Sequence, residues 1–316
     1  MKLRFGILST ASIVPRFLKA ARETDELQVT ALASRNLEKA REKAKEWDIP
    51  LAFGSYEELL RAPEIDAVYI ATINNHHGRY ARQALEAGKH VLCEKPFVTS
   101  EEEVHQLFAL AREKGLFLME AQKAVFLPAI QKAKELIKSG ALGRVGMIEF
   151  SSPIDPGYNK WQFDPEKFGG PLYGNCVYSV EISQFLFDCA AIRCAGLRTT
   201  GSTTVEDQFS GVLLLENGVL FTNRCSTRVD IRHTAVIYGE KGSIEIPAYW
   251  RARDLILRRP GCEPEIFSYP CAHELVYEVR HVAACIRAGC VTSPVMTEEM
   301  TARAIRTLRS LDQAFQ

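Results

Sequence analysis

Short apolar runs alternate with amphipathic stretches over the first 120 residues of the chain. The apolar runs have the length of buried strands, and the amphipathic stretches have the spacing of helices that cover a sheet. Ser100 stands three positions before a glutamate, as at a helix start, and Gly115 ends that predicted helix. Alternating strands and helices predict βαβ units and a parallel sheet. The predicted strands are residues 3–8, 27–33, 67–71, 90–93 and 116–119, and the predicted helices are residues 13–22, 36–47, 77–87 and 101–114.

After residue 120 the pattern changes to strand-like runs joined by turns, with helical segments among them and after them. Asn217-Gly218 predicts one tight hairpin, and residues 239–242 predict another. Hairpins predict an antiparallel sheet, so we expect one domain at residues 1–120 and an α+β domain at residues 121–316. The predicted strands are 145–151, 209–215, 219–226, 234–238, 243–246 and 255–258, and the predicted helices are 128–139, 177–187, 271–288 and 297–314.

The composition excludes several classes of protein. The chain has 316 residues, enough for two domains, and its 39 Lys and Arg balance its 39 Asp and Glu. It therefore lacks the basic excess of a nucleic-acid-binding protein. No apolar run approaches the ~18 residues of a transmembrane helix, and the N-terminus lacks a signal-peptide core. Nine cysteines without a Cys-x-x-Cys pair predict reduced thiols in a cytoplasmic protein, with no zinc site and no membrane partner.

The turn after the first predicted strand is where a parallel sheet of this kind binds a dinucleotide. Ser9, Ala11 and Val14 occupy the positions of the three glycines in a G-x-G-x-x-G fingerprint. Small residues still permit a tight turn, and hydroxyl groups add donors for a phosphate. An ordinary strand-to-helix turn is the alternative interpretation. The candidate cofactor contacts of this turn are Gly6, Ser9, Thr10, Ala11, Ser12 and Ile13.

The second predicted strand ends in Ser34-Arg35. An acidic residue at this place would bind the ribose hydroxyls of NAD, whereas an arginine accommodates the 2′-phosphate of NADP. Lys39 lies one helical turn beyond Arg35 and can reach the same phosphate. Incidental charge at a solvated helix start is the alternative. We therefore expect NADP(H) as the favoured cofactor, with NAD(H) possible.

The run Gly88-Lys89-His90-Val91-Leu92-Cys93-Glu94-Lys95-Pro96 resembles the Gfo/Idh/MocA oxidoreductases, as does Thr72-Ile73-Asn74-Asn75-His76-His77. The resemblance extends over essentially the whole chain. It implies a fold of α/β class: an N-terminal Rossmann-type parallel-sheet domain followed by an α+β domain with a large, mostly antiparallel, open-faced sheet. It also implies that this sheet joins copies into a homo-oligomer, a dimer or a tetramer.

By the same resemblance, Thr72, Asn74 and His77 line the nicotinamide side of the cofactor, and Glu94 and Lys95 form the catalytic centre. The resemblance implies a cis bond before Pro96. The chemistry suits a lysine, because hydride transfer from an alcohol carbon also requires loss of the hydroxyl proton. A lysine near that hydroxyl stabilises the developing alkoxide and relays the proton. A surface Lys-Pro turn is the alternative interpretation.

The second domain carries a related segment that departs from the family at one position. Many members read Gly-Gly-x-Leu-x-Asp-x-Gly-x-His/Tyr, and here Gly174 replaces the carboxylate while Tyr178 matches the final position. A tyrosine hydroxyl there can bind a substrate oxygen and pass a proton. Tyr178 as an amphipathic core residue is the alternative. A further departure lies near Lys123 and Val125, where related members carry an aromatic residue and an arginine.

These residues predict an NADP(H)-dependent oxidoreductase that moves a hydride between nicotinamide and a small polyol, sugar or related hydroxy or carbonyl compound. Lys95 is the predicted proton donor or acceptor, and Tyr178 assists it. The alternative is a catalytically silent dinucleotide-binding sensor or partner subunit, which the missing carboxylate and the glycine-poor turn motivate. A buried sheet residue is an equally good interpretation of His233. The further candidate substrate contacts are Tyr158, Trp161, Asn175 and His233.

Overall fold

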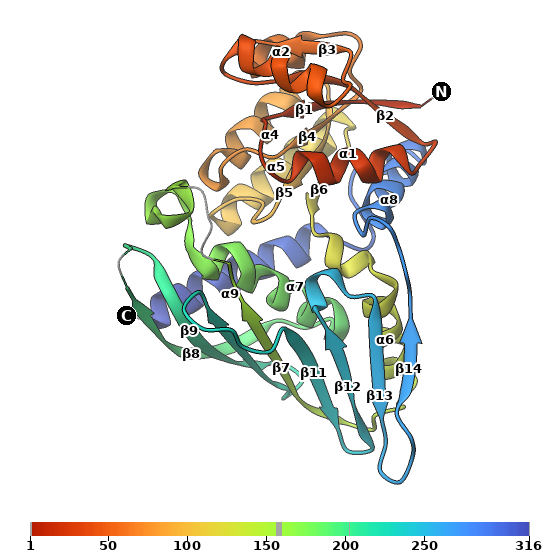
Figure 1. Ribbon diagram of the computed structural model, residues 1–316, viewed down its shortest axis with the longest axis vertical. Helices are drawn as coiled ribbons and strands as arrows, with labels where there is room; N and C mark the ends of the chain where they lie inside the picture. Colours follow the sequence, from red (N-terminus) through yellow and green to blue (C-terminus); the bar gives the residue numbers. More distant parts are fainter. Residues whose placement is uncertain (1, 156–159, 202, 316) are drawn as a thin grey trace. The chain divides into compact units, whose positions relative to one another are not determined.

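Residues 2–155, 160–201 and 203–315 are described by a computed structural model of the chain (Figure 1). Their contacts divide the chain into two units. The first unit comprises Met1–Ala121 and His273–Thr301, and the second comprises Gln122–Ala272 and Ala302–Gln316. The boundary after Ala121 adjoins the predicted one, whereas residues 273–301 do not belong with the predicted second domain.

Residues 273–301 group with the first unit because backbone bonds and ion pairs tie them to it. The N–H of Leu118, in the last strand of the first unit's sheet, donates to the carbonyl of Val291 at 3.1 Å. The carboxylate of Glu298 accepts a hydrogen bond from His105 Nδ1 at 2.8 Å and pairs with Arg112. A helical pattern in a sequence does not show which sheet the helix covers. The predicted second domain of residues 121–316 is therefore corrected by the removal of this segment.

Six strands form the sheet of the first unit. They are β1 (Leu3–Leu8), β2 (Leu27–Ala33), β3 (Leu51–Phe53), β4 (Ala67–Ile70), β5 (His90–Glu94) and β6 (Leu118–Ala121). All pair in parallel, in the order β3-β2-β1-β4-β5-β6. The order reverses between β1 and β4, and sheets of this kind bind ligands at the carboxyl ends of strands beside such a reversal. The predicted Rossmann-type sheet is confirmed.

The helices of the first unit are α1 (Val14–Arg22), α2 (Leu37–Glu46), α3 (Tyr56–Arg61), α4 (His77–Glu86), α5 (Glu101–Lys114) and α8 (Val276–Arg287). Side-chain oxygens of Asn36, Ser55 and Ser100 accept backbone N–H bonds at the starts of α2, α3 and α5. These bonds satisfy donors that a helix start leaves unpaired. By contrast, α1 begins after Ile13 without a side-chain cap.

Eight strands form the sheet of the second unit. They are β7 (Val145–Pro153), β8 (Ala191–Thr200), β9 (Glu206–Leu215), β10 (Leu220–Ser226), β11 (Thr234–Gly239), β12 (Gly242–Pro247), β13 (Asp254–Arg258) and β14 (Glu265–Ser268). Their order is β14-β13-β12-β11-β7-β10-β9-β8. Only the neighbours β7 and β10 pair in parallel among these described strands, so the predicted, mostly antiparallel sheet is confirmed.

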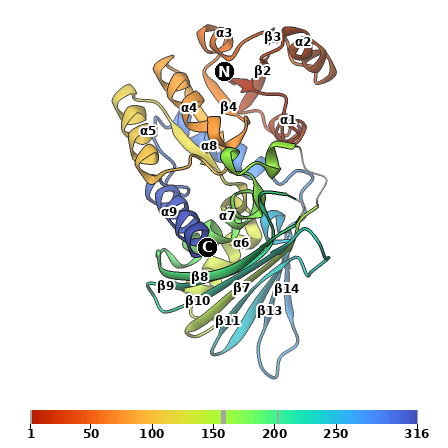
Figure 2. The same ribbon diagram turned by 90° about the vertical axis from the view of Figure 1, so that its left-hand side faces the viewer.

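The two faces of this eight-stranded sheet differ in burial. The helices α6 (Pro128–Lys138), α7 (Val177–Phe187) and the later turns of α9 (Glu298–Ala314) lie on one side of it (Figure 2). One cross-strand row is at most 2% exposed and consists of Leu213, Phe221, Ile148, Ile237, Ile244 and Leu257. The adjacent row faces the other way, has no buried member and consists of Ala195, Val212, Thr222, Glu149, Val236, Glu245, Ile256 and Ile266.

Candidate functional site

The candidate cofactor residues of the first unit gather at one edge of the parallel sheet. Leu8 pairs with Ala33 on one side and with Ile70 on the other, and Ile70 pairs with Cys93. Because the strands are parallel, the loops that follow these positions leave the sheet at the same edge. The loops are residues 9–13, 34–36, 71–76 and 95–100. They contain the predicted cofactor residues except Gly6, Lys39, His77 and Glu94. Glu94 is the last residue of β5 and adjoins the fourth loop.

Ser9 folds the first of these loops without a glycine. Its φ is 116°, a backbone region that side chains rarely adopt, at the position of the first fingerprint glycine. The Ser9 N–H donates to the Ala33 carbonyl at 3.1 Å, and its Oγ accepts a bond from the Ala11 N–H at 3.0 Å. Thr10, Ser12 and Ile13 complete this turn into α1. The uncapped start of α1 is a suitable place for a phosphate group.

Gly6 has a packing role in the sheet, and its assignment as a cofactor contact stays a prediction. It lies within β1, three residues before the turn, and is buried. A Cβ at this position would stand 2.6 Å from Cδ2 of Leu59 in α3. The glycine therefore allows α3 to pack closely on the strand.

Ser34 and Arg35 follow β2, as predicted. Ser34 is 8% exposed, its N–H donates to the Phe53 carbonyl at 3.2 Å, and its Oγ accepts from the Asn36 N–H at 3.4 Å. Arg35 is exposed and forms no ion pair with any carboxylate of the described residues. Lys39 lies in the first turn of α2, also exposed. This end of β2 thus offers guanidinium and hydroxyl groups and no acidic side chain, a donor set that fits a phosphate.

The loop after β4 holds a buried hydroxyl that has no protein partner. Thr72 Oγ1 is inaccessible to water and accepts or donates no hydrogen bond within the described chain. Asn74 is 6% exposed in the same loop. A buried polar atom of this kind needs a partner, because its desolvation is otherwise uncompensated. The amide and hydroxyl groups of a dinucleotide would supply that partner.

His77 connects this loop to the turn that follows β5. Its Nδ1 lies 2.9 Å from the Pro96 carbonyl oxygen, and its Nε2 lies 3.1 Å from the Thr72 carbonyl oxygen. Burial lowers the pKa of His77, and the two carbonyl bonds oppose this effect only in part. Both nitrogens face backbone carbonyl oxygens, and the neutral ring donates its single N–H to one of them. The His77 ring thus lies between the loop after β4 and the turn after β5.

The Glu94-Lys95-Pro96 turn stands at the end of β5. The bond between Lys95 and Pro96 is cis, as the resemblance implied. The Glu94 carboxylate accepts a hydrogen bond from the Tyr69 hydroxyl and another from the Lys95 N–H at 3.3 Å. Lys95 itself is half-buried. The backbone that carries Lys95 is thus held on both sides of the residue.

In the second unit, Tyr178 lies in the first turn of α7 and contacts a lysine from a separate segment. Lys123 begins a 3₁₀-helix, Lys123–Phe126, and its Nζ donates to the Tyr178 hydroxyl at 3.0 Å. The Tyr178 and Trp250 rings lie 6.1 Å apart between centroids. A pattern search would not have found this cluster, because its three members come from segments far apart in the chain.

Asn175 and His233 line one cavity of about 600 Å³ in the second unit, together with Trp250 and Arg251. Asn175 is fixed by bonds to Ser152 Oγ and from the Tyr249 hydroxyl, both at 3.3 Å. His233 stacks on Trp250, with ring centroids 5.8 Å apart, and its buried Nε2 has no hydrogen-bond partner among the described atoms. Burial lowers the pKa of His233, and Arg251 lowers it further.

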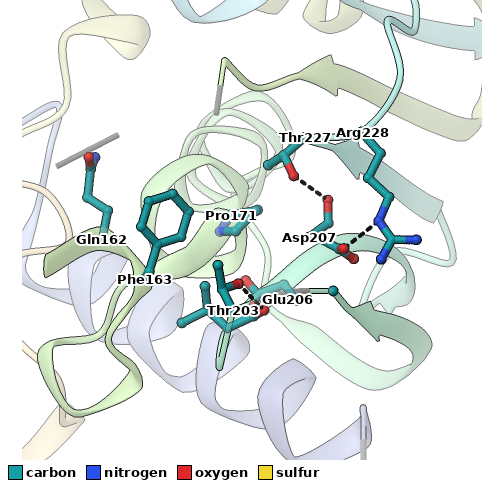
Figure 3. Close-up of a pocket in the computed structure, with 10 residues that line it drawn as sticks. Gln162, Phe163, Pro171, Thr203, Glu206, Asp207, Thr227 and Arg228 are labelled. Carbon is teal, nitrogen blue, oxygen red and sulfur yellow. Dashed lines mark hydrogen bonds and ion pairs between the residues drawn. The ribbon is translucent and has the colours of Figure 1, made fainter. Parts of the chain in front are cut away.

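A second cavity of about 390 Å³ contains none of the predicted site residues. The Asp207 backbone carbonyl accepts a hydrogen bond from the Thr227 hydroxyl at 3.1 Å, and the Asp207 carboxylate pairs with Arg228 (Figure 3). Glu206 and Thr203 also line this cavity. Burial raises the pKa of the Glu206 carboxyl. Trp161 is half-buried and lines neither this cavity nor the larger one. The candidate Tyr158 lies outside the described residues.

The segment before α7 is a π-helix, Leu172–Cys176, which includes Gly174 and Asn175. π-Helical turns are rare and occur often at functional sites. Gly174 is exposed, and a Cβ there would meet nothing within 4 Å. Packing around its Cβ position therefore does not require a glycine at residue 174.

Comparison with known proteins decides the family. Residues 3–122 match the profile described as "Oxidoreductase family, NAD-binding Rossmann fold", and residues 130–245 match the "GFO/IDH/MocA C-terminal domain". The chain belongs to the Gfo/Idh/MocA oxidoreductases. The resemblance carried by Glu94-Lys95-Pro96 is confirmed, and so is the class of NAD(P)-dependent oxidoreductase.

Relatives of known activity align with almost the entire chain. The trans-1,2-dihydrobenzene-1,2-diol dehydrogenase of Mus musculus is 33% identical over 309 residues, which cover 94% of this chain and 92% of the relative. The Homo sapiens protein of the same name is 33% identical over 310 residues, with the same shares covered. Both therefore align with this chain over nearly their whole length.

Solved structures of the family share the fold at lower identity. An aldose-aldose oxidoreductase from Caulobacter crescentus, complexed with glycerol, has a TM-score of 0.90 at 22% identity and covers 100% of this chain and 98% of its own. A 3-ketoreductase from Actinomadura kijaniata, with NADP and TDP-benzene, has a TM-score of 0.89 at 23% identity, with 99% and 98% covered. A levoglucosan dehydrogenase with NADH and levoglucosan has a TM-score of 0.89 at 19% identity, with 100% and 97% covered. None of the helices in the described ranges is long and apolar enough to cross a membrane.

Proposed function

We propose that the chain is an NADP(H)-dependent oxidoreductase that transfers a hydride between nicotinamide and a small polyol, sugar or related hydroxy or carbonyl compound. The observation that carries this proposal is the place of Lys95, in a fixed turn at the ligand-binding edge of the parallel sheet. The names of the relatives support the substrate class, because they include dehydrogenases of a dihydrodiol and of a sugar derivative.

The donor groups of the sheet edge fit the parts of NADP. The turn at Ser9 and the start of α1 would hold the pyrophosphate, and Ser34 and Arg35 would hold the 2′-phosphate, with Lys39 nearby. Thr72 would use its unpartnered hydroxyl on the nicotinamide side. The bound cofactor supplies the hydride acceptor or donor.

Lys95 is assigned the proton that accompanies the hydride. As an ammonium it donates a hydrogen bond to the substrate oxygen and stabilises negative charge that develops there during alcohol oxidation. In the reverse direction it gives a proton to the carbonyl oxygen. Tyr178, from the second unit, is assigned a hydrogen bond to the same oxygen and a share in the proton transfer.

A catalytically silent partner on this fold is the other candidate. Two observations suggest this alternative. The first is the glycine-poor turn, but Ser9 adopts the positive φ of a fingerprint glycine, so the turn forms without one. The second is the glycine at residue 174 in place of a carboxylate, and it still supports the alternative. The test therefore begins with fluorescence titration of NADPH and NADH, followed by assays with trans-dihydrodiols, aldoses and their keto derivatives. Cofactor binding with no turnover of any of these would favour the silent partner.

Lys95→Ala tests the catalytic assignment. We expect turnover to fall about 10²–10⁴-fold, as for the loss of a general acid or base, while NADPH affinity is retained. Lys114→Ala, at the end of α5, is the matched control and leaves turnover unchanged. Full activity of Lys95→Ala would remove the residue from the mechanism.

Arg35→Asp tests the cofactor preference. The substitution removes the guanidinium and places a carboxylate where it repels a 2′-phosphate, so we expect the preference to move toward NADH. Arg41→Ala, in the following helix, is the control, because Arg41 is paired with Glu38. An unchanged ratio of NADPH to NADH affinity would show that Arg35 does not read the 2′-phosphate.

The proposal includes a homo-oligomer formed through the open face of the eight-stranded sheet, and a cytoplasmic location. Apolar side chains on that face support the first part: Leu197 is 82% exposed, Ile266 64% and Val212 41%. All nine cysteines are free, which agrees with a reducing compartment.

A further inference from the structure

A buried lysine of the second unit directs its charge at the hydroxyl of Tyr178. Lys123 is 3% exposed, and its Nζ lies 3.0 Å from the Tyr178 oxygen. The same Nζ lies 4.7 Å from the ring centroid of Tyr178 and 4.7 Å from that of Trp250. Three separate segments of the chain therefore meet around one cation.

The backbone before Lys123 is fixed from two directions. The Gln122 side chain accepts a bond from the Ala124 N–H at 3.4 Å and donates one to Glu181 in α7. Glu181 lies one helical turn after Tyr178 on α7. The same helix thus anchors the lysine's backbone and presents the tyrosine, which keeps the two side chains in register.

The direction of the hydrogen bond between Lys123 and Tyr178 determines where the Tyr178 hydroxyl hydrogen points. An ammonium group only donates, so the Tyr178 oxygen accepts from Lys123. The hydroxyl hydrogen of Tyr178 is then directed elsewhere, where it can be given to another acceptor. A buried ammonium is costly to desolvate, and the two rings and the phenol oxygen compensate for part of that cost.

We propose that Lys123 is a positioning residue that aims the Tyr178 hydroxyl and stabilises its oxygen when the proton leaves. This inference rests on the proposed function for the role of Tyr178 in proton transfer. During reduction of a carbonyl, the carbon gains the hydride and the substrate oxygen gains one proton, which Lys95 gives. The Tyr178 O–H bond then breaks, and its proton replaces the one that Lys95 has given. The electron pair stays on the phenol oxygen, where the Lys123 ammonium donates a charge-assisted hydrogen bond. During oxidation the same bonds form and break in the opposite sense.

The position of Gly174 explains why such a lysine matters here. Because residue 174 is a glycine, the second unit lacks the acidic group that many related segments carry at this position. Lys123 supplies a charge of the opposite sign on another element, next to the only tyrosine of α7. The inferred proton path therefore uses a lysine–tyrosine pair in place of a carboxylate.

Nitration of Tyr178 tests the pair without any substrate or cofactor. Tetranitromethane reacts with phenolate, so we expect the rate of nitration at Tyr178, followed by peptide mass spectrometry on the whole protein, to fall about tenfold in Lys123→Met. Lys123→Arg keeps the charge and restores most of the rate. Tyr238, exposed on the open face of the sheet, is the internal control and reacts equally in all variants.

Kinetics provides the second readout, as a double-mutant cycle. We expect Lys123→Met to lower kcat about 10²-fold with little change in KM, and Lys123→Arg to recover most of kcat. In the Tyr178→Phe background, Lys123→Met has no further effect, because the two residues act as one unit. Additive losses in this cycle would overturn the inference.

The outcomes separate the inference from the proposed function. A wild-type protein without turnover, with Tyr178 nitration still dependent on the charge at residue 123, overturns the function and supports the pair. Equal nitration of Tyr178 in the wild type and in folded Lys123→Met overturns the pair. If Lys123→Met does not fold, Lys123→Gln replaces it, with thermal unfolding as the check on folding.

Discussion

The parallel sheet of the first unit is covered on both faces, whereas the eight-stranded sheet of the second unit is covered on one. In β4, all four residues are buried, and in β9, buried Leu213 alternates with exposed Val212. Parallel strands joined through helices acquire cover on both faces, but hairpins place no helix between strands. The difference assigns separate tasks to the two sheets.

The first sheet can present chemistry only where its strands end, because its faces are closed. The candidate cofactor residues accordingly stand in loops after β1, β2, β4 and β5. The second sheet supports α7, which carries Tyr178, on its covered face and leaves the side chains of its other face exposed or half-buried. The candidate residues of the first unit therefore lie at one edge of its sheet, whereas Tyr178 of the second unit lies on a helix that covers one face of its sheet.

The largest expected effect comes from truncations on both faces of a strand. Ile7→Ala and Leu8→Ala in β1 should each lower the free energy of unfolding by about 2–5 kcal/mol, because both residues are fully buried. In β9, Leu213→Ala should cost as much, while Val212→Ala should stay within about 0.5 kcal/mol. Urea unfolding of dilute protein measures all four. A large cost for Val212→Ala in the monomer would contradict the contrast.

Acid should destabilise the first unit more than the second. Burial lowers the pKa of His77, His90 and His281 in the first unit, and of His233 in the second. Below the ordinary value of 6.5 the unfolded chain binds protons that the folded one does not, so stability falls with pH until the folded histidines are protonated. Each such histidine contributes a slope of up to about 1.4 kcal/mol per pH unit.

Hydrogen exchange between about pH 7 and pH 5, corrected for the intrinsic rates, measures this loss separately in the two units. The substitution His77→Gln should flatten the pH dependence of the first unit, and His233→Gln that of the second. Equal loss of protection in both units would remove the contrast.

A charge on the open face should weaken association of the chain. Val212→Glu places a carboxylate in the exposed row, and we expect the dissociation constant of the oligomer to rise about tenfold or more, which is about 1.4 kcal/mol. Leu37→Glu, at an exposed site of α2, is the control. Light scattering across a concentration series measures both. An oligomer that tolerates Val212→Glu would place its interface elsewhere.

The smallest effect concerns helix caps, which the first unit uses at three helix starts. Ser100→Ala should lower the free energy of unfolding by about 1 kcal/mol, because the Glu103 N–H loses its acceptor. Ser139→Ala, after α6 in the second unit, caps no helix start and should cost less. Thermal unfolding of the two variants side by side shows whether the caps carry this difference.

Much of the fold followed from local patterns, and the exceptions share a cause. Strands with apolar runs were predicted close to their observed bounds. By contrast, β8 was not predicted, because none of its residues is buried and no apolar alternation marks it. The strands β3 and β14 are too short, at three and four residues, to show a period. The parallel pair β7 and β10 was also missed, since pairing partners far apart in the chain leave no local signal.

The candidate site likewise contains residues whose positions local patterns predict and a contact that they do not. The positions of Ser9, Arg35, Thr72 and Lys95 relative to the sheet were predictable, because each follows a strand and parallel strands share an edge. The contact between Lys123 and Tyr178 was not, because 55 residues separate the two. Packing between distant segments brings the two side chains together, so the contact is visible only in the folded structure.

The return of residues 273–301 to the first unit also bears on how the chain is made. The N-terminal 121 residues leave the ribosome first, yet α8 and the first turn of α9 complete their unit only after some 300 residues have been synthesised. Domains usually fold in the order in which they emerge. Here the first unit cannot be completed until residue 301 has been synthesised, by which time residues 122–272 of the second unit have already been made.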